Sequence, residues 1–252
     1  MYRTEQGPLH VFNPFTKLVV TLLVLWAAFG LPGVLAPLLV LGLALLPLSL
    51  WAGLFRPVLR LCWTLVGPTA AVLLVMQGLL YPGATHVLVA LGPFAIYREG
   101  LDFAALISLR LLVMAAAFGL LLMTTHPGRL MSDLTRRGLS PSMAYLVVAS
   151  LQIPPEMQER ARAILDAQRA RGLRTHGGIG QRIRALIPLV GPLVFGSLVA
   201  SQERAVALDA RAFNTTSRVT QWEEIADTRV EYWLRWGCVF MALLIGASRL
   251  WR

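Results

Sequence analysis

Residues 18–55 read LVVTLLVLWAAFGLPGVLAPLLVLGLALLPLSLWAGLF and contain no charged side chain. One helix of this length would rise about 57 Å at 1.5 Å per residue. The hydrocarbon core of a bilayer is only about 30 Å thick. Two crossings fit better, because Gly30-Leu31-Pro32-Gly33 can form the turn between them. The stretch therefore predicts membrane spans near residues 18–31 and 34–54.

The composition of the whole chain also indicates a membrane protein. Of its 252 residues, 56% are hydrophobic and 14% are charged, and the mean hydropathy is +0.64. A soluble domain carries about 25% charged residues, so too little polar surface remains to cover a water-exposed globule. Further apolar runs predict spans near residues 61–81, 101–123 and 232–248. The expected fold class is an all-α membrane protein with about five transmembrane helices.

Two segments between these spans have a different character. Residues 82–100 contain two short β-type runs around Gly92-Pro93 and predict a small hairpin outside the bilayer. Residues 126–229 hold fourteen arginines and nine acidic residues. They predict a basic, water-facing insert of amphipathic helices. It would separate an N-terminal membrane part, residues 1–125, from a C-terminal transmembrane helix in residues 230–252.

Proline and glycine residues divide this insert into three predicted helices. The first runs from Pro127 to Gly138, the second from Pro154-Pro155 to Gly172, and the third from Gly191-Pro192 to about Ala212. Two apolar stretches, residues 143–153 and 186–200, are short for a membrane span. We expect them to dock against the membrane helices.

The distribution of basic residues predicts the orientation in the membrane. One side receives Arg3, Lys17, Arg56, Arg60 and the insert arginines, and the other receives Arg98, Arg249 and Arg252. Because basic loops stay in the cytoplasm, the N-terminus and residues 126–229 are predicted to be cytoplasmic. The C-terminus then lies outside after an odd number of crossings.

The sequence predicts no catalytic residue, cofactor site or metal site. Lys17 is the only lysine and has no glycine beside it, whereas a P-loop ATPase needs Gly-Lys-Ser/Thr. Cys62 and Cys238 lie in apolar segments, and the four histidines are scattered without ligand spacing. Acidic residues interspersed in the insert argue against nucleic acid as a partner. We expect the basic insert to be attracted to the lipid bilayer instead. The alternative function is a stand-alone secondary transporter, although such proteins usually carry mid-membrane polar groups and repeated halves.

One arginine lies inside the span at residues 101–123. An unpaired charge is costly there, so Arg110 is expected either to reach toward Glu99 or Asp102, or to pair with a partner protein. We favour a structural role for Arg110 within this chain over a contact with a partner protein.

A weak internal repeat is the most informative feature of the insert. Glu159-Arg160-Ala161 leads to a helix end at Ala170-Arg171-Gly172, and Glu203-Arg204-Ala205 leads to one at Ala210-Arg211-Ala212. An arginine between small residues at a helix end can reach into a partner's groove with several directed hydrogen bonds. The competing interpretation is that the helix dipole alone favours a basic residue there.

These residues resemble a known family, the transmembrane T components of energy-coupling factor (ECF) transporters. Residues 9–18, LHVFNPFTKL, resemble the N-terminal signature of that family, and Pro155–Gly172 is similar to its helix ending in Ala-Gln-Arg-Ala-Arg-Gly. Ala207–Phe213 resembles the second motif, with Ala212 where glycine is common. The resemblance covers nearly the whole chain.

The resemblance implies a function as well as a fold. A T component sits in the inner (plasma) membrane of a bacterium or archaeon. There it joins two cytoplasmic ABC-type ATPases to one membrane-embedded substrate-binding S component. The complex imports a vitamin or a transition-metal ion, and ATP is bound by the partner subunits. By this resemblance the ATPase-coupling residues would be Ala170, Arg171 and Gly172, together with Ala210, Arg211 and Ala212.

Overall fold

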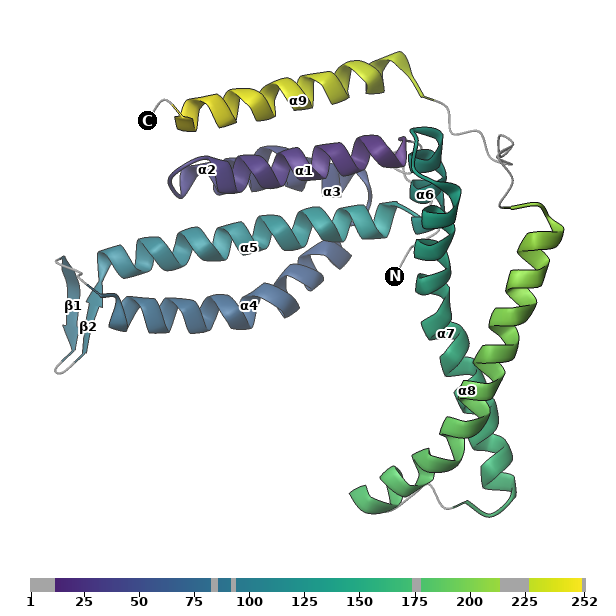
Figure 1. Ribbon diagram of the computed structural model, residues 1–252. Coiled ribbons are helices and arrows are strands. Elements are labelled where there is room, and N and C mark those ends of the chain that lie inside the picture. The colour runs from purple at the N-terminus through teal and green to yellow at the C-terminus, as the bar shows by residue number, and fades with distance from the viewer. Residues whose placement is uncertain (1–11, 83–85, 92–93, 174–177, 214–226, 251–252) are drawn as a thin grey trace. The chain divides into compact units, whose positions relative to one another are not determined.

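The computed structural model describes residues 12–82, 86–91, 94–173, 178–213 and 227–250 (Figure 1). The chain forms two compact units, one of Met1–Asp133 with Ile225–Arg252 and one of Leu134–Glu224. The elements of the first unit are α1 (Pro14–Gly30), α2 (Leu35–Leu39), the π-helical η2 (Val40–Leu45), α3 (Leu46–Trp51), α4 (Phe55–Leu80), β1 (Val87–Leu91), β2 (Phe94–Tyr97), α5 (Arg98–Thr124) and α9 (Arg229–Leu250). The helix α6 (Pro127–Arg136) crosses the boundary, and α7 (Pro141–Ala170) and α8 (Ile179–Ala210) belong to the second unit.

The first unit is a layer of long helices that run side by side. Helix α5 packs along α4 and also against α1, and α1 packs in turn against α9 (Figure 1). Small residues let α5 approach its neighbours closely, because Ala115, Ala116 and Ala117 are all buried. A Cβ atom added to Gly119 would lie 2.6 Å from Leu61 Cδ2. Small residues at helix contacts are the usual packing solution within a bilayer.

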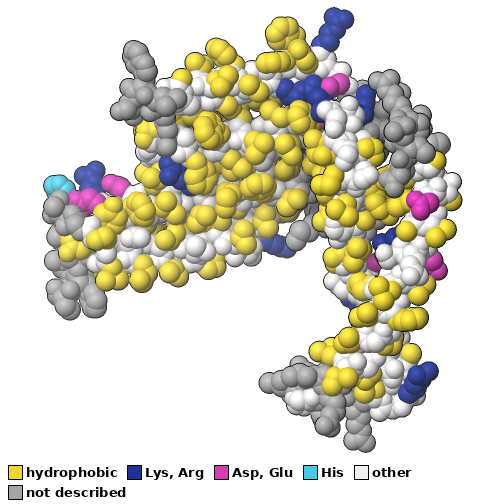
Figure 2. All heavy atoms as spheres, in the orientation of Figure 1, with side chains coloured by type: hydrophobic (Ala, Val, Ile, Leu, Met, Phe, Trp, Pro, Cys, Tyr) yellow, Lys and Arg dark blue, Asp and Glu magenta, His cyan; other side chains and the backbone are white. Residues whose placement is uncertain are grey.

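The predicted spans all coincide with helices, and the all-α membrane class is confirmed. Four helical stretches are long and apolar enough to cross a membrane: Phe55–Leu80, Arg98–Thr124, Leu186–Ala210 and Arg229–Ala247. Two shorter apolar helices, Pro14–Gly30 and Leu35–Trp51, occupy the first two predicted spans. Apolar side chains dominate the visible face of these helices (Figure 2). Such a surface belongs against lipid rather than water, so the chain is a multi-pass membrane protein.

The second predicted span contains a local irregularity. Residues 35–51 are helical throughout but pass through the π-helical segment η2, where the Leu46 N–H bonds to the Leu41 carbonyl five residues back. Pro37 and Pro47 flank this segment and lack the N–H donor of an α-helical ladder. The predicted turn before it is confirmed, since α1 ends at Gly30 and Gly33 has a φ of +88°.

The predicted hairpin is also confirmed as a pair of strands. Strands β1 and β2 pair antiparallel, with Leu91 opposite Phe94. The Gly92-Pro93 dipeptide between them lies outside the described residues.

The helices of the second unit begin earlier than predicted. Helix α7 starts at Pro141 and runs through Pro154 and Pro155, and α8 starts at Ile179 and runs through Pro188 and Pro192. A proline removes one backbone donor and bends a helix, but it need not end one. The residues that do end helices here are Gly138 and Gly172, with φ values of +113° and +92°. Both of these ends are where the sequence predicted them.

This continuity corrects the argument about the two apolar stretches. Residues 143–153 and 186–200 are parts of α7 and α8 rather than short separate pieces. Length therefore does not distinguish α8 from the membrane helices, and Leu186–Ala210 is long and apolar enough to span. Like α5 and α9, it carries charged residues toward one end, namely Glu203, Arg204 and Asp209.

Candidate functional site

The two predicted arginine motifs have the same backbone structure. Arg171 is the C-cap of α7 with φ −85° and ψ 6°, and Arg211 is the C-cap of α8 with φ −88° and ψ 7°. After Arg171, the Gly172 N–H bonds to Arg169 O at 2.9 Å and the Leu173 N–H to Gln168 O at 3.0 Å. After Arg211, the corresponding bonds join Ala212 to Asp209 at 2.9 Å and Phe213 to Leu208 at 3.1 Å. Both ends are therefore Schellman motifs.

The two motifs differ in the residue that takes the left-handed conformation. Gly172 adopts it with φ +92°, whereas Ala212 adopts it with φ +55°. A left-handed conformation costs a residue with a Cβ atom roughly 1–2 kcal/mol. Ala212 takes it nonetheless, and the backbone at Arg211 matches that at Arg171.

The two arginine residues lie on the surface of the second unit. Both residues are exposed, and their flanking residues Ala170 and Ala210 are exposed too. Backbone N–H groups already bond to the carbonyls at each helix end. Among the described residues, neither guanidinium has a hydrogen-bond or ion-pair partner.

A charged cluster joins α7 to α8 where they meet. The Glu156 carboxylate accepts a hydrogen bond from Arg160 at 2.9 Å and another from Arg204 of α8. Arg160 also donates to the Gly196 carbonyl of α8 at 3.0 Å. The hydrogen bond from Arg204, with the charge of Arg160 beside it, lowers the pKa of Glu156 below its ordinary value.

This cluster explains the internal repeat. The repeated Glu-Arg-Ala triplets contribute Arg160 and Arg204, and both arginines bind the same carboxylate. Sequence reasoning missed this role of Glu156. The repeat itself was the available signal, since Arg160 lies eleven residues before Arg171 and Arg204 lies seven before Arg211.

An aromatic contact places the end of α8. The Phe213 ring meets the Tyr145 ring edge-on, with centroids 5.5 Å apart and an interplanar angle of 61°. Arg211 therefore lies near the start of α7. From Tyr145 to Arg171, α7 rises about 39 Å at 1.5 Å per residue. Within the second unit, the two arginines are thus held near opposite ends of α7, which crosses α8 in Figure 1.

A second polar cluster, in the first unit, ties α1 to α9. Asn13 is 1% exposed and caps α1 by accepting from Phe15 N, while its own N–H donates to Glu231 at 2.7 Å. Arg235 forms two 2.9 Å hydrogen bonds with Asp227 and donates to Thr16 at 3.2 Å. The N-terminal signature residues Asn13 and Thr16 thus contribute to an anchor for α9. Their partners were missed, although Asp227, Glu231 and Arg235 recur every four residues.

Arg110 has a structural role of a kind that the sequence did not predict. Its guanidinium donates to the carbonyls of Ala28 at 3.2 Å and of Phe29 and Leu31 at 3.4 Å. It therefore caps the C-terminus of α1, where helix carbonyls lack partners. The expected pairing with Glu99 or Asp102 is wrong, because the Glu99 carboxylate accepts from His86 N and Asp102 lies near Arg98. Among the described residues, no group of three His, Cys, Asp or Glu side chains could hold a metal ion.

Comparison with known proteins identifies the family. The family model for the cobalt transport protein CbiQ matches residues 5–222. The ECF transporter transmembrane protein EcfT of Thermanaerovibrio acidaminovorans is 32% identical over 238 residues, which cover 88% of this chain and 86% of the relative. That of Heliobacterium modesticaldum is 33% identical over 229 residues, or 84% and 82% of the two chains.

A third relative has a different name. A putative ABC transporter ATP-binding protein of Bifidobacterium longum is 33% identical over 147 residues, which cover 54% of this chain but only 19% of that protein. The extent of the family match and the two nearly full-length relatives lead to one assignment. This chain belongs to the CbiQ family of cobalt transport proteins, together with the EcfT transmembrane proteins of ECF transporters.

Proposed function

We propose that this chain is the transmembrane coupling subunit of an ECF-type importer for a vitamin or a transition-metal ion. It would bind two cytoplasmic ABC-type ATPases through Arg171 and Arg211, and one membrane-embedded S component through its membrane helices. The observation that carries the proposal is the pair of matching helix ends, each presenting an exposed guanidinium with no partner among the described residues.

The placement of the arginines favours two partners rather than one. Each motif ends a different helix, and α7 rises about 39 Å between Tyr145, beside the end of α8, and Arg171. The two backbones have the same conformation, so each arginine can enter the same kind of groove on an identical or homologous subunit. The Bifidobacterium longum relative supports an ATPase as that partner, because a segment similar to this chain lies within a protein named for ATP binding. In our proposal, ATP is bound by these partners, and this chain needs no cofactor.

The cluster around Glu156 suits transmission of movement. A crossing fixed by Arg160 and Arg204 would let α7 and α8 move together when the ATPases bind and hydrolyse ATP. That movement would reorient the S component in the membrane. We place residues 126–229 in the cytoplasm of a bacterium or archaeon, as the arginine distribution indicates.

Substitution of the two arginines tests this proposal. Arg→Ala removes a charge-assisted contact worth about 1.5–3 kcal/mol, so each single variant should bind ATPase about ten- to a hundredfold more weakly. The double variant Arg171→Ala, Arg211→Ala should release both ATPases and abolish uptake. Arg→Lys should restore binding only in part, since an ammonium lacks the planar fork of donors. The measurement is co-purification of the ATPases and substrate uptake at matched membrane abundance.

The matched control is Arg162→Ala. Arg162 is an exposed arginine within α7, and no partner is described for it. Its removal should leave co-purification unchanged. If the double variant keeps both ATPases and uptake at the wild-type level, the proposed coupling role of these arginines is wrong.

A further inference from the structure

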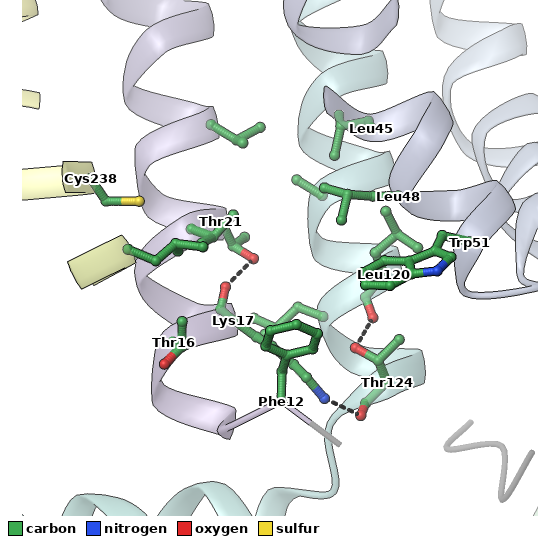
Figure 3. A pocket seen from close by; sticks show the side chains of 15 residues that line it. Phe12, Thr16, Lys17, Thr21, Leu45, Leu48, Trp51, Leu120, Thr124 and Cys238 are labelled. Carbon is green, nitrogen blue, oxygen red and sulfur yellow. Dashed lines mark hydrogen bonds between the residues drawn. The ribbon is translucent and has the colours of Figure 1, made fainter. Parts of the chain in front are cut away.

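A pocket of about 370 Å³ opens in the first unit between α1, α3, α5 and α9. It lies where α1 and α9 begin and where α3 and α5 end. Its walls are formed mainly by apolar side chains, including Leu45, Leu48, Trp51, Leu120 and Cys238 (Figure 3). Apolar cavities favour apolar guests over water.

One charged group lines this pocket, the ammonium of Lys17. It donates to the Thr124 carbonyl at 3.0 Å (Figure 3). An ammonium has three donors, and within the described part of the chain the Thr124 carbonyl is its one hydrogen-bond partner. Two donors therefore remain for a ligand. A half-buried cation among apolar walls is costly unless an anion accompanies it.

The neighbouring polar groups do not supply that anion. The hydroxyls of Thr21 and Thr124 donate to carbonyls of their own helices, and that of Thr16 accepts from Arg235. The nearby Glu231 carboxylate attracts the Lys17 charge, but less strongly than Arg129 repels it, and it already accepts from Asn13 and Thr228. Arg129 of α6 repels the Lys17 charge. The local field therefore favours a negative group brought by a ligand.

We propose that this pocket binds an anionic amphiphile, with its acyl chain between Leu48, Leu120 and Cys238 and its negative head group on the Lys17 ammonium. A membrane offers two sources of this chemistry, an anionic phospholipid and a free fatty acid. Both combine an apolar chain with an anion, which matches one apolar pocket ending at one ammonium. The site would make the anchor between α1 and α9 sensitive to the lipid around it.

Native mass spectrometry of the full chain in mild detergent tests the site. Phosphatidylglycerol and palmitate serve as anionic probes, and phosphatidylcholine is the zwitterionic control. The wild type should retain one phosphatidylglycerol or one palmitate about tenfold more strongly than phosphatidylcholine, as expected for a charge-assisted contact. The anionic probe that is retained identifies the source.

Two variants separate the acyl-chain contact from the charge contact. Leu48→Trp fills the pocket and should abolish retention, whereas Leu39→Trp, at a 55% exposed position on the same span, should not. Lys17→Gln should lose the preference for anions, and Lys17→Arg should keep it. Equal retention by Leu48→Trp and the wild type would overturn the proposal. So would retention without any preference for the anionic probes, or no retention of either one.

Discussion

At the residue scale, Ala212 is the most informative residue, because alanine is unfavourable in the backbone conformation that it adopts. It occupies a left-handed position, φ +55°, that glycine occupies in the matching motif at Gly172. A residue with a Cβ atom loses roughly 1–2 kcal/mol there, and glycine loses about 0.5–1 kcal/mol in conformational entropy on folding. The balance favours glycine at this position.

We therefore expect Ala212→Gly to stabilise the end of α8 by about 0.5–1 kcal/mol. Amide hydrogen exchange in residues 205–213 should slow by about two- to fivefold. The reciprocal change, Gly172→Ala, should loosen the end of α7 by a similar amount. Ala210→Gly, inside the helix, should be destabilising by about 1 kcal/mol. Faster exchange in Ala212→Gly would contradict this account of the cap.

At the element scale, the carboxylate of Glu156 holds α7 against α8. Glu156→Gln removes the charge that Arg160 and Arg204 share, so both arginines lose their ion pair. We expect the variant to have a lower thermal midpoint in detergent and faster hydrogen exchange around Gly196. Glu159→Gln is the control, because Glu159 is exposed and no partner is described for it. Equal effects of the two substitutions would show that the cluster does not join the helices.

Comparison of the wild type with Glu156→Gln should also reveal a pH dependence of stability. The folded state lowers the pKa of Glu156, chiefly through the hydrogen bond from Arg204. Its contribution is therefore complete above the unfolded pKa of about 4.3, and it disappears as the pH falls through the folded pKa. The difference in thermal midpoint between wild type and Glu156→Gln should be constant near neutral pH and vanish in acid.

At the scale of the whole molecule, cysteine labelling tests the predicted orientation. In a background with Cys62→Ala and Cys238→Ala, Leu88→Cys and Ser142→Cys occupy exposed positions in β1 and at the start of α7. A membrane-impermeant maleimide should label Leu88→Cys in intact cells and Ser142→Cys only in inside-out vesicles. Labelling of Ser142→Cys in intact cells would reverse the orientation.

Two more cysteines test whether α8 crosses the membrane. Gly180→Cys and Val206→Cys lie at either end of the apolar stretch Leu186–Ala210. A cytoplasmic insert predicts that both are labelled only from the inside. Labelling of the two from opposite sides would show that α8 is a sixth span. Residues 126–229 would then not form a cytoplasmic insert.

The sequence by itself determined the membrane class, the approximate positions of the helices and the two arginine ends. These features follow from local properties. An uncharged run of 38 residues favours lipid over water, and Gly172 ends α7 because it adopts a left-handed backbone conformation. Sequence reasoning was wrong at Pro155 and Pro192, where it predicted that helices begin. In the structure, α7 and α8 continue through these prolines.

Only the tertiary structure decided which distant residues meet. Glu156 pairs with Arg204 at a separation of 48 residues, and Asn13 meets Glu231 at a separation of 218. Arg110 binds carbonyls at the end of α1 rather than the carboxylates of Glu99 or Asp102, which are nearer in sequence. The reason is that α5 packs beside α1 and brings these carbonyls within reach of the Arg110 side chain. Helical periodicity predicts which face a residue occupies. It does not predict which helix lies opposite, and that choice depends on the packing of the whole unit.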